Sequence, residues 1–270
     1  MKSRDDTYLS EGIAERILAE DFIDPIVTLA DYRGDLQMHS TYSDGTQTLA
    51  EIVTACLALG HHYAAVTDHS YGLPVAHGMS MERAARQHAE IDQVNAQYGK
   101  KFRLLKGVEA NILEDGSLDL LNEELRQFEL VVASPHSALR SRADQTRRLV
   151  KAVSNPLVDI LGHPSGRRSG KRSGLTVRWA EVFAAAARHG VAIELDGYAE
   201  RQDLDWTLAA EAREAGCLFA VDSDAHTSAQ LRYSRIGLAH ARLAQLPANR
   251  ILNCWPVAKI LKWAAKRRQR

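Results

Sequence analysis

Residues 191–226 read VAIELDGYAERQDLDWTLAAEAREAGCLFAVDSDAH. The stretch opens with an apolar run ending at Glu194, continues as a helical pattern over 204–215, and closes with a second apolar run ending at Asp224 and His226. Continuous apolar runs are typical of strands buried on both faces, and a helix is the usual connection between parallel strands. The segment therefore predicts two parallel strands joined by a helix.

The same alternation extends from residue 34 to about residue 255. Seven apolar runs end in metal-binding residue types: His39, Asp68 with His69, Glu109, His136, His163, Glu194, and Asp224 with His226. Helical patterns lie between them, over 48–59, 80–98, 117–128, 142–153, 176–189 and 204–215. A closed barrel gathers the carboxyl ends of all its strands at one rim, whereas an open doubly wound sheet places its ligand at one switch point. Polar residues at nearly every strand end therefore favour an α/β barrel with seven strands.

Short segments flank the predicted barrel on both sides. Residues 1–33 are expected to form a helical leader, with a helix over 12–21, and residues 34–255 to form the barrel domain. Residues 256–270 predict a last helix that begins near Pro256 and a basic tail. The cationic residues of that tail are expected to be disordered and solubilising: Lys266, Arg267, Arg268 and Arg270.

Composition excludes several classes of protein. The 270 residues are 45% hydrophobic and 25% charged, and Lys plus Arg equals Asp plus Glu at 34 each, so the whole molecule lacks the positive charge of a dedicated DNA-binding protein. The start has no apolar signal-peptide core, and no run is long enough for a membrane span. Three widely spaced cysteines, Cys56, Cys217 and Cys254, predict reduced thiols. We expect a cytoplasmic protein without a membrane or an obligate protein partner.

The strand ends predict a metal cluster. Residues i and i+2 of a strand face the same way, so Gln37 points with His39, and Asp224 with His226. A single histidine is usually structural, but a regular set at strand ends is not expected of an ordinary core. Histidine binds zinc, iron and manganese, and carboxylates can bridge two ions. The set exceeds what one ion needs, which predicts two or three divalent ions (Mn, Zn or Fe).

Six ordered motifs also carry a family resemblance. GDLQMHS-TYSDG, TDHS, GVEANI, SPHS, GHPSGR and DSDAH, spread over residues 34–255, resemble the successive motifs of the polymerase and histidinol phosphatase (PHP) superfamily of metal-dependent phosphoesterases. The resemblance is closest to the C-terminal PHP module of bacterial family X DNA polymerases. The polymerase domains are absent from this chain, so it looks like a free-standing version.

The resemblance implies a distorted, TIM-like (β/α)7 barrel with up to three ions at the C-terminal rim of its strands. Its motifs place the ligands in three sets: His39, Glu109 and Asp224, with Gln37 as a weak ligand where many relatives have a second histidine; Glu109 again with His136, and His163 close by; and Asp44 with His69 and His226. Glu194 is not expected to be a ligand.

The chemistry that such a cluster implies is phosphoester hydrolysis. Two ions lower the pKa of a shared water, and the resulting hydroxide attacks the phosphorus in line. Asp68 or His226 would help the leaving oxygen depart, although Asp68 could instead hold a histidine ring or a water. The loop GHPSGRRSGKRSG follows His163 at this rim, and we expect Arg167 to contact the phosphate, with Arg168, Lys171 and Arg172 beside it.

Three functions remain open at the level of sequence. The first is a phosphoesterase that acts on DNA or RNA ends, as a 3′–5′ exonuclease or a 3′-phosphatase. The second is a small-molecule phosphatase of the histidinol phosphatase type. The third is a metal-binding scaffold without turnover, since the amide of Gln37 binds zinc more weakly than imidazole does. The native metal, the substrate and the oligomeric state do not follow from the sequence.

Overall fold

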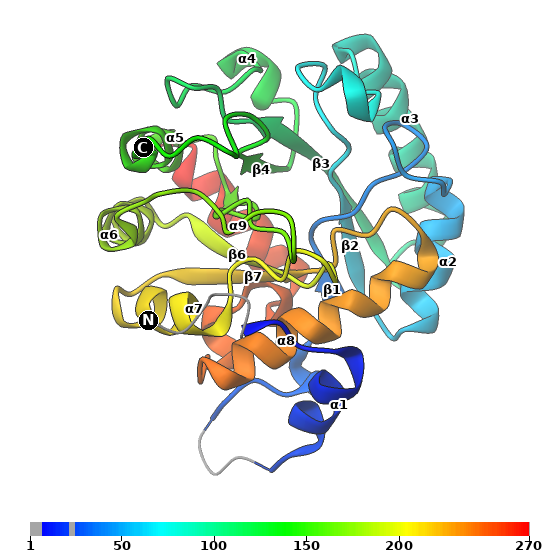
Figure 1. Ribbon diagram of the computed structural model, residues 1–270. Helices are drawn as coiled ribbons and strands as arrows, with labels where there is room; N and C mark the ends of the chain where they lie inside the picture. The colour runs from blue at the N-terminus through cyan, green and yellow to red at the C-terminus, as the bar shows by residue number, and fades with distance from the viewer. Residues whose placement is uncertain (1–6, 22–24, 270) are drawn as a thin grey trace.

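The computed structural model describes residues 7–21 and 25–269, and it contains a single seven-stranded parallel sheet in sequence order (Figure 1). The strands are β1 (Gly34–Asp35), β2 (Tyr63–Val66), β3 (Arg103–Asn111), β4 (Leu130–Ser134), β5 (Ile160–Leu161), β6 (Ala192–Asp196) and β7 (Leu218–Asp222). Each strand pairs with the next one along the chain. The expected strand count and parallel order are confirmed.

The sheet curls into a nearly closed barrel. The segment after β1 meets the segment after β7, where Met38 and Ala225 form an isolated parallel bridge. The His39 amide donates to the Ala225 carbonyl at 2.8 Å, and the Asp224 amide donates to the Gln37 carbonyl at 3.1 Å. Closure therefore occurs between the two sequence segments with the most potential ligands, and it brings them face to face. The predicted TIM-like barrel is confirmed.

Helices surround the barrel. They are α1 (Glu11–Ala19), α2 (Leu49–Ala58), α3 (Met81–Tyr98), α4 (Asn122–Leu125), α5 (Thr146–Ser154), α6 (Trp179–His189), α7 (Trp206–Glu214), α8 (Ser234–Leu243) and α9 (Val257–Arg267), with 3-10 turns η2 (Leu29–Asp31), η3 (Pro74–Ala76), η4 (Ser228–Tyr233), η5 (Ala248–Arg250) and η6 (Leu252–Cys254). Thr48, Ser80 and Asp205 cap α2, α3 and α7 with side-chain oxygens, as expected for helix starts. The helix α8 lies in a segment for which the apolar pattern predicts none.

The predicted helix over residues 117–128 is wrong, because only α4 forms there. Gly116 has a φ of 83°, which a turn allows and a helix does not. The turn is closed by the Leu113 amide, which donates to the Ser117 carbonyl at 2.8 Å. The Asp119 carboxylate then accepts from the Asn111 amide at 2.9 Å and from the Ser70 hydroxyl at 2.6 Å. Acidic and hydroxyl side chains here bond the neighbouring backbone and loops, which competes with helix formation.

The flanking segments are both packed. Helix α1 lies along α8 (Figure 1), where Ala14 and Ile17 join Ile236 and Ala239 in a small buried cluster. Of the predicted leader, residues 1–6 and 22–24 lie outside the described residues. No helix within residues 7–21 and 25–269 combines the length and the apolar character that crossing a membrane requires.

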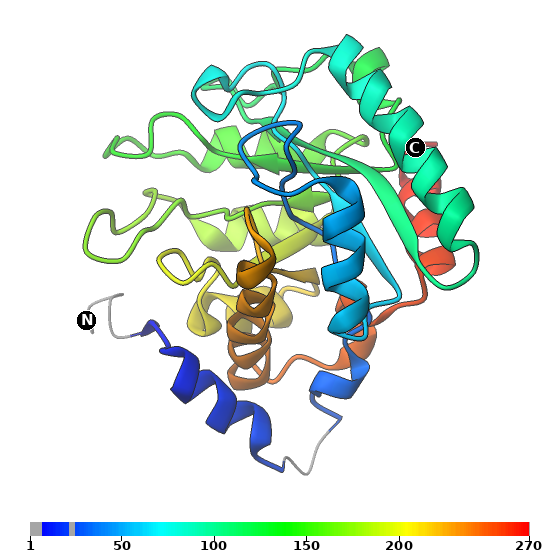
Figure 2. The same cartoon turned by 90° about the vertical axis from the view of Figure 1, so that its right-hand side faces the viewer.

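The expected disorder of the basic tail is wrong for its central residues. Arg267 and Arg268, at the end of α9, pair with Asp159 at 2.8 Å and 2.7 Å, and Arg268 also bonds the Phe128 carbonyl. A buried carboxylate at the start of β5 needs cationic partners, and α9 supplies them. Arg270 lies outside the described residues. In Figure 2, α9 is on the right of the barrel, and the loops that follow β4 and β5 extend to the left.

Candidate metal centre

Glu109, near the end of β3, is the centre of the site. Its carboxylate is fully buried and faces four imidazoles. One oxygen, Oε2, lies 3.0 Å from His69 Nδ1 and 3.6 Å from His39 Nε2. The other, Oε1, lies 2.8 Å from His163 Nε2 and 3.4 Å from His136 Nε2. A carboxylate with two histidines on each oxygen has the arrangement of a bridge between two cations.

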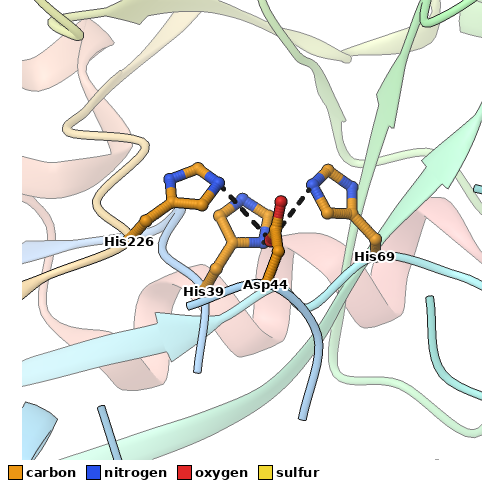
Figure 3. Close-up of side chains that lie close together, drawn as sticks. All are labelled: His39, Asp44, His69 and His226. Atoms are coloured by element: carbon orange, nitrogen blue, oxygen red, sulfur yellow. Dashed lines mark ion pairs between the residues drawn. The ribbon is translucent and has the colours of Figure 1, made fainter. Parts of the chain in front are cut away.

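Asp44 forms a second focus at the mouth of the site. Figure 3 shows its carboxylate between the rings of His226 and His69, with His39 behind. Asp44 Oδ1 lies 3.4 Å from His226 Nε2, 3.7 Å from His69 Nε2 and 3.9 Å from His39 Nδ1. These spacings exceed a metal–ligand bond, and the atoms surround a common point as ligands of one ion do.

Asp224 completes the cluster from the β7 side. Its Oδ1 lies 3.0 Å from His39 Nε2. Three sets of potential ligands thus overlap, with their ligand atoms within 4.8 Å of one another: His39, Asp44, His69 and His226; His69, Glu109 and His136; and His39, Glu109 and Asp224. The eight residues expected as the main ligands are all brought together. The structure departs from the expected sets because His39 and His69 each face two foci.

Two of the rings are oriented by hydrogen bonds from their second nitrogen. Asn111 Oδ1 lies 2.5 Å from His136 Nδ1, and the Asn111 amide nitrogen donates to Asp119. His226 Nδ1 lies 2.8 Å from the Asp224 carbonyl. The contact with Asn111 places the proton of His136 on Nδ1, so its Nε2 lone pair faces the cluster, as metal-binding histidines require. Burial alone would lower the pKa of His226, but the bond to Asp44 and the charge of Asp224 outweigh burial and raise that pKa to about 9. Sequence reasoning missed Asn111, although it lies two residues beyond Glu109 in the quoted motif GVEANI.

Several buried atoms in the cluster make no hydrogen bond within the described part of the chain. They are His39 Nδ1, His69 Nδ1, Glu109 Oε2 and His136 Nε2. Buried polar atoms are nearly always satisfied, so a concentration of exceptions on facing side chains needs an explanation. Divalent cations provide one, because these atoms belong to the three overlapping sets of potential ligands and each has a lone pair that can bind an ion. The donor set of imidazoles and carboxylates suits zinc, manganese or iron; actual ion binding stays a prediction.

The pKa shifts of Glu109, Asp44 and His136 favour the protonation states that bind cations. Burial alone would raise the pKa of Glu109, but His136 and His69 outweigh it and hold that pKa well below its usual range. For Asp44 the bond to His226 and nearby imidazoles likewise overcome burial and lower the pKa to about 2. Burial lowers the pKa of His136 to about 4 despite Glu109. Ionised carboxylates and a neutral imidazole are the protonation states in which these groups bind metals.

Backbone conformation at the site is unusual at two of these residues. His163 has a φ of 22° and Asp224 a φ of 51°, both in the region that non-glycine residues rarely adopt. Gly45 is required for a different reason, because a Cβ there would lie 2.3 Å from the His39 carbonyl oxygen. Such conformations are concentrated at functional sites, where surrounding contacts hold them.

Gln37 directs its amide nitrogen at the bridge. Nε2 donates to Glu109 Oε1 at 3.1 Å, while Oε1 has no hydrogen-bond partner within residues 7–21 and 25–269. A side chain bound to Glu109 in this way is a positioning group for the carboxylate. Its expected role as a weak ligand through Oε1 stays a prediction.

Asp68 does not occupy the place expected of an acid or of a partner to a histidine. Its carboxylate is fully buried and accepts from the Ser40 amide, the Ser40 and Ser43 hydroxyls and the Gln87 amide nitrogen. These bonds fix the loop that carries Asp44. The expectation that Asp68 contacts a leaving group or an imidazole is therefore wrong, because its lone pairs are directed into that loop.

Arg167 does not reach the cluster either. Its side chain is 2% exposed and packs over the ring of Tyr8, and its guanidinium bonds Asp205 at 3.1 Å and the Arg201 carbonyl at 2.9 Å. The predicted phosphate contact is therefore wrong. The loop turns this side chain inward, because the buried carboxylate of Asp205 needs a cationic partner.

Arg201 is the cation at the cluster that sequence reasoning missed. Its Nη1 lies 2.8 Å from Asp224 Oδ2, and its side chain remains 25% exposed. Burial alone would lower its pKa, but Asp224 and Asp196 outweigh that effect and raise it. The residue lies in the loop between β6 and α7, seven positions beyond Glu194, so no strand-end rule identifies it.

Glu194 lies beneath the ligands. Its Oε2 accepts from the His163 amide, and burial together with Asp196 and Asp222 raises its pKa well above the usual range. Burial also raises the pKa of Asp222, to about 6. A carboxyl group held protonated is a poor metal ligand, which agrees with leaving Glu194 out of the ligand set.

Comparisons with known proteins agree with this geometry. A family model described as the PHP domain matches residues 35–198. The DNA polymerase/3′-5′ exonuclease PolX of Bacillus subtilis (strain 168) is 37% identical over 229 residues, which cover 84% of this chain and 40% of that protein. The chain thus corresponds to well under half the length of that relative. A probable phosphatase of Thermoanaerobacter sp. (strain X514) is 28% identical over 80% of this chain and 94% of its own length.

Two solved structures share the fold. Histidinol phosphate phosphatase from Lactococcus lactis, solved with zinc, L-histidinol and phosphate, has a TM-score of 0.55 at 18% identity, over 78% of this chain and 94% of that chain. The putative histidinol phosphatase from Listeria monocytogenes has a TM-score of 0.58 at 14% identity, over 74% of this chain and 97% of that one.

Proposed function

The chain belongs to the PHP domain family of metal-dependent phosphoesterases, and from this premise we propose that it hydrolyses phosphate esters at the ends of nucleic-acid strands. The observation that carries the hydrolytic part is the Glu109 carboxylate with two imidazoles on each oxygen, next to ligand-type atoms that lack hydrogen bonds. The nucleic-acid part draws on the 37% identity to a polymerase with 3′–5′ exonuclease activity.

The residues of the rim divide into holding and orienting groups. His39, His69, Glu109, His136 and Asp224, together with Asp44, His163 and His226, would hold two or three divalent ions. Such ions, when bound, lower the pKa of a coordinated water and polarise the phosphoryl oxygens. Asn111 would keep the His136 lone pair directed at the site, and the carboxylate of Asp68 would keep Asp44 in place.

Arg201 replaces Arg167 as the cation assigned to the phosphate. Its guanidinium is anchored by Asp224 and its side chain is a quarter exposed, so a bound anion can reach it. His226 is the most exposed histidine of the cluster, at 22% of its side chain, compared with 14% for His136 and 7% for His69. With Asp68 directed elsewhere, His226 is the histidine of the cluster closest to solvent for assisting the leaving oxygen.

A phosphatase acting on a small molecule is the second candidate. The match to a probable phosphatase over 94% of its length supports it, as does the fold shared with the histidinol phosphate phosphatase. The two candidates differ in what is attached to the phosphate. They share the same cluster, so the choice depends on the surface around the cluster.

A substrate panel tests the proposal. The protein, loaded in turn with manganese, zinc or iron, would be offered a 5′-labelled single strand ending in a 3′-hydroxyl, the same strand ending in a 3′-phosphate, and a set of phosphorylated metabolites. We expect stepwise shortening of the first strand or loss of the terminal phosphate from the second. Hydrolysis of metabolites without any change in either strand would refute the nucleic-acid proposal and favour the second candidate.

A third outcome bears on the scaffold alternative. Stoichiometric metal binding with no hydrolysis of any substrate would indicate that the site holds ions without turnover. Metal content and hydrolysis should therefore be measured on the same preparation.

A further inference from the structure

Two loops at the rim enclose a cleft that lies outside the metal cluster. They follow β4 and β5, over residues 137–145 and 164–176, and extend on the same side of the barrel (Figure 2). The cleft has a volume of about 250 Å³. Its polar lining comes from both loops: Arg140, Ser141 and Arg142 from the first, and Lys171, Arg172 and Ser173 from the second.

The cleft is held together by backbone contacts and packing. The Gln145 amide donates to the Thr176 carbonyl at 2.9 Å, which joins the ends of the two loops. Leu139 covers Gly166 so closely that a Cβ on Gly166 would lie 2.6 Å from the leucine. Arg148 fixes the start of the first loop through the Ser137 carbonyl and hydroxyl, both at 2.9 Å. The lining residues are therefore presented by a structure that exists before any ligand binds.

Positive charge in the cleft is poorly compensated. Lys171 lies 3.3 Å from Glu200, which also pairs with Arg168. Within the described residues, Arg140, Arg142 and Arg172 have no ion pair with a carboxylate, and Arg172 donates instead to the Gly166 carbonyl at 3.1 Å. Clustered cations without counter-charges repel one another, so an anion in the cleft would lower their electrostatic energy.

The position of the cleft relates it to the cluster. The first loop begins immediately after His136 and the second immediately after His163, two of the imidazoles on Glu109 Oε1. The cleft is thus a second compartment of the same rim, formed by the two loops that leave the cluster at these ligands.

When a phosphate is bound at the cluster, this second compartment remains open to a second anion. One guanidinium group can donate two parallel hydrogen bonds to phosphate oxygens, and the serine hydroxyls can donate to the same oxygens. A phosphorylated metabolite with one phosphate offers nothing to this compartment, whereas a nucleic-acid strand carries a phosphodiester next to the one being cleaved. Phosphate contacts of this kind fix the register of a strand on a protein.

We propose that the cleft between residues 137–145 and 164–176 binds the phosphodiester adjacent to the scissile phosphate of a single nucleic-acid strand, through Arg140, Arg142 and Arg172. The proposal rests on the proposed nucleic-acid function and assigns its substrate contacts. It makes the cleft the feature that distinguishes a strand from a simple phosphomonoester.

The test is a binding measurement that does not depend on turnover. A fluorescein-labelled 12-nucleotide single strand with phosphorothioate linkages at its 3′ end would be titrated with the metal-loaded protein, and anisotropy would report Kd at several salt concentrations. The variant Arg140→Gln with Arg142→Gln removes two charges from exposed positions and leaves a polar, uncharged side chain at each. Its matched control, Arg16→Gln with Arg188→Gln, removes two exposed charges from α1 and the end of α6.

We expect the cleft variant to raise Kd about tenfold or more at low salt. The slope of log K against log salt should also fall by up to about 0.7, because both arginines contact one phosphate and each phosphate contact on a single strand contributes about 0.7. The control should match the wild type in both quantities, and thermal midpoints should verify that both variants fold.

The outcomes separate the two proposals. Equal Kd values for the cleft variant and the wild type, equal weakening by the control, or no binding of the strand by the wild type would each overturn the cleft proposal. Cleft-dependent binding by a wild-type protein that neither releases nucleotides from an unmodified strand nor removes a 3′-terminal phosphate would support the cleft and contradict the proposed hydrolysis.

Discussion

The two ends of the barrel differ in whether a buried carboxylate has all its hydrogen-bond and ion-pair partners. At the end opposite the rim, the Asp159 carboxylate is fully buried and saturated, with Arg267 at 2.8 Å, Arg268 at 2.7 Å and the Val131 amide at 2.9 Å. At the rim, Glu109 is equally buried, yet its Oε2 and the facing His69 Nδ1 lack hydrogen-bonding geometry. Removing one partner of a saturated buried charge destabilises a fold, whereas a buried charge that lacks partners has atoms free to bind a ligand.

Removing the saturated charge should have the largest effect, on stability. Replacing Asp159 with Asn leaves two guanidinium groups without their counter-charge, one of them nearly buried, and we expect a loss of about 3 kcal/mol in the free energy of unfolding. Urea denaturation would measure it. The control is Glu15→Gln, which breaks the more exposed pair with Arg235 and should cost at most about 1 kcal/mol.

Metal content should not change in the Asp159→Asn variant. If the variant lost both stability and bound metal, the two ends of the barrel would be energetically linked. The two buried carboxylates would then not have separate roles in stability and in metal binding. Equal stability losses for the Asp159 and Glu15 variants would show that burial does not distinguish these pairs.

Removing the unsaturated charge should have a smaller effect on folding and a large one on function. In Glu109→Gln the carboxylate bridge is lost, and we expect at least a hundredfold loss of metal affinity, about 2.7 kcal/mol, with a parallel loss of hydrolysis. Elemental analysis after dialysis against a chelator would give the metal content. Glu194→Gln is the control, since Glu194 bonds the His163 amide beneath the ligands and should keep bound metal.

Retention of all metal by Glu109→Gln would contradict the assignment of Glu109 as a bridge. Loss of metal by the Glu194 variant to the same degree would show that the carboxyl groups below the ligands belong to the site as well.

The smallest expected effect concerns Gln37. A histidine at this position would exchange an amide that donates to Glu109 for an imidazole that can bind an ion, and we expect about tenfold tighter binding of the most weakly held ion, about 1.4 kcal/mol. Titration of the metal-free protein would measure it. The comparison variant Gln37→Leu removes both the amide donor and any ligand oxygen, so it should bind that ion no more tightly than the wild type.

Unchanged affinity in Gln37→His would mean that this position only orients Glu109. Tighter metal binding in both the His and the Leu variant would contradict a ligand role for residue 37. It would indicate that the amide of Gln37 weakens metal binding in the wild type.

Much of this arrangement can be predicted from the sequence. Period and length of the apolar runs predict the parallel strands, because a strand buried on both faces must be apolar throughout until it reaches the rim. The ligand candidates follow from the same rule, since the first polar residues after such runs project at the carboxyl ends of the strands. Every main candidate, from His39 to His226, lies in one cluster.

Local sequence was insufficient wherever a long-range partner decided the outcome. The helix predicted over 117–128 fails because Asp119 bonds Asn111, eight residues earlier, and Ser70, 49 residues earlier. The helix α8 forms against α1 and the barrel, and its own apolar pattern did not reveal it.

What the sequence alone determined is the barrel, its seven strands and the set of rim residues that face one another, because these depend on periodicity along the chain. Tertiary structure alone decided the roles of the arginines: Arg167 is buried against Asp205, Arg201 pairs with Asp224, and Arg267 and Arg268 neutralise Asp159. A long cationic side chain reaches whichever carboxylate the fold places near it, and that choice is made across the barrel, where periodicity gives no information.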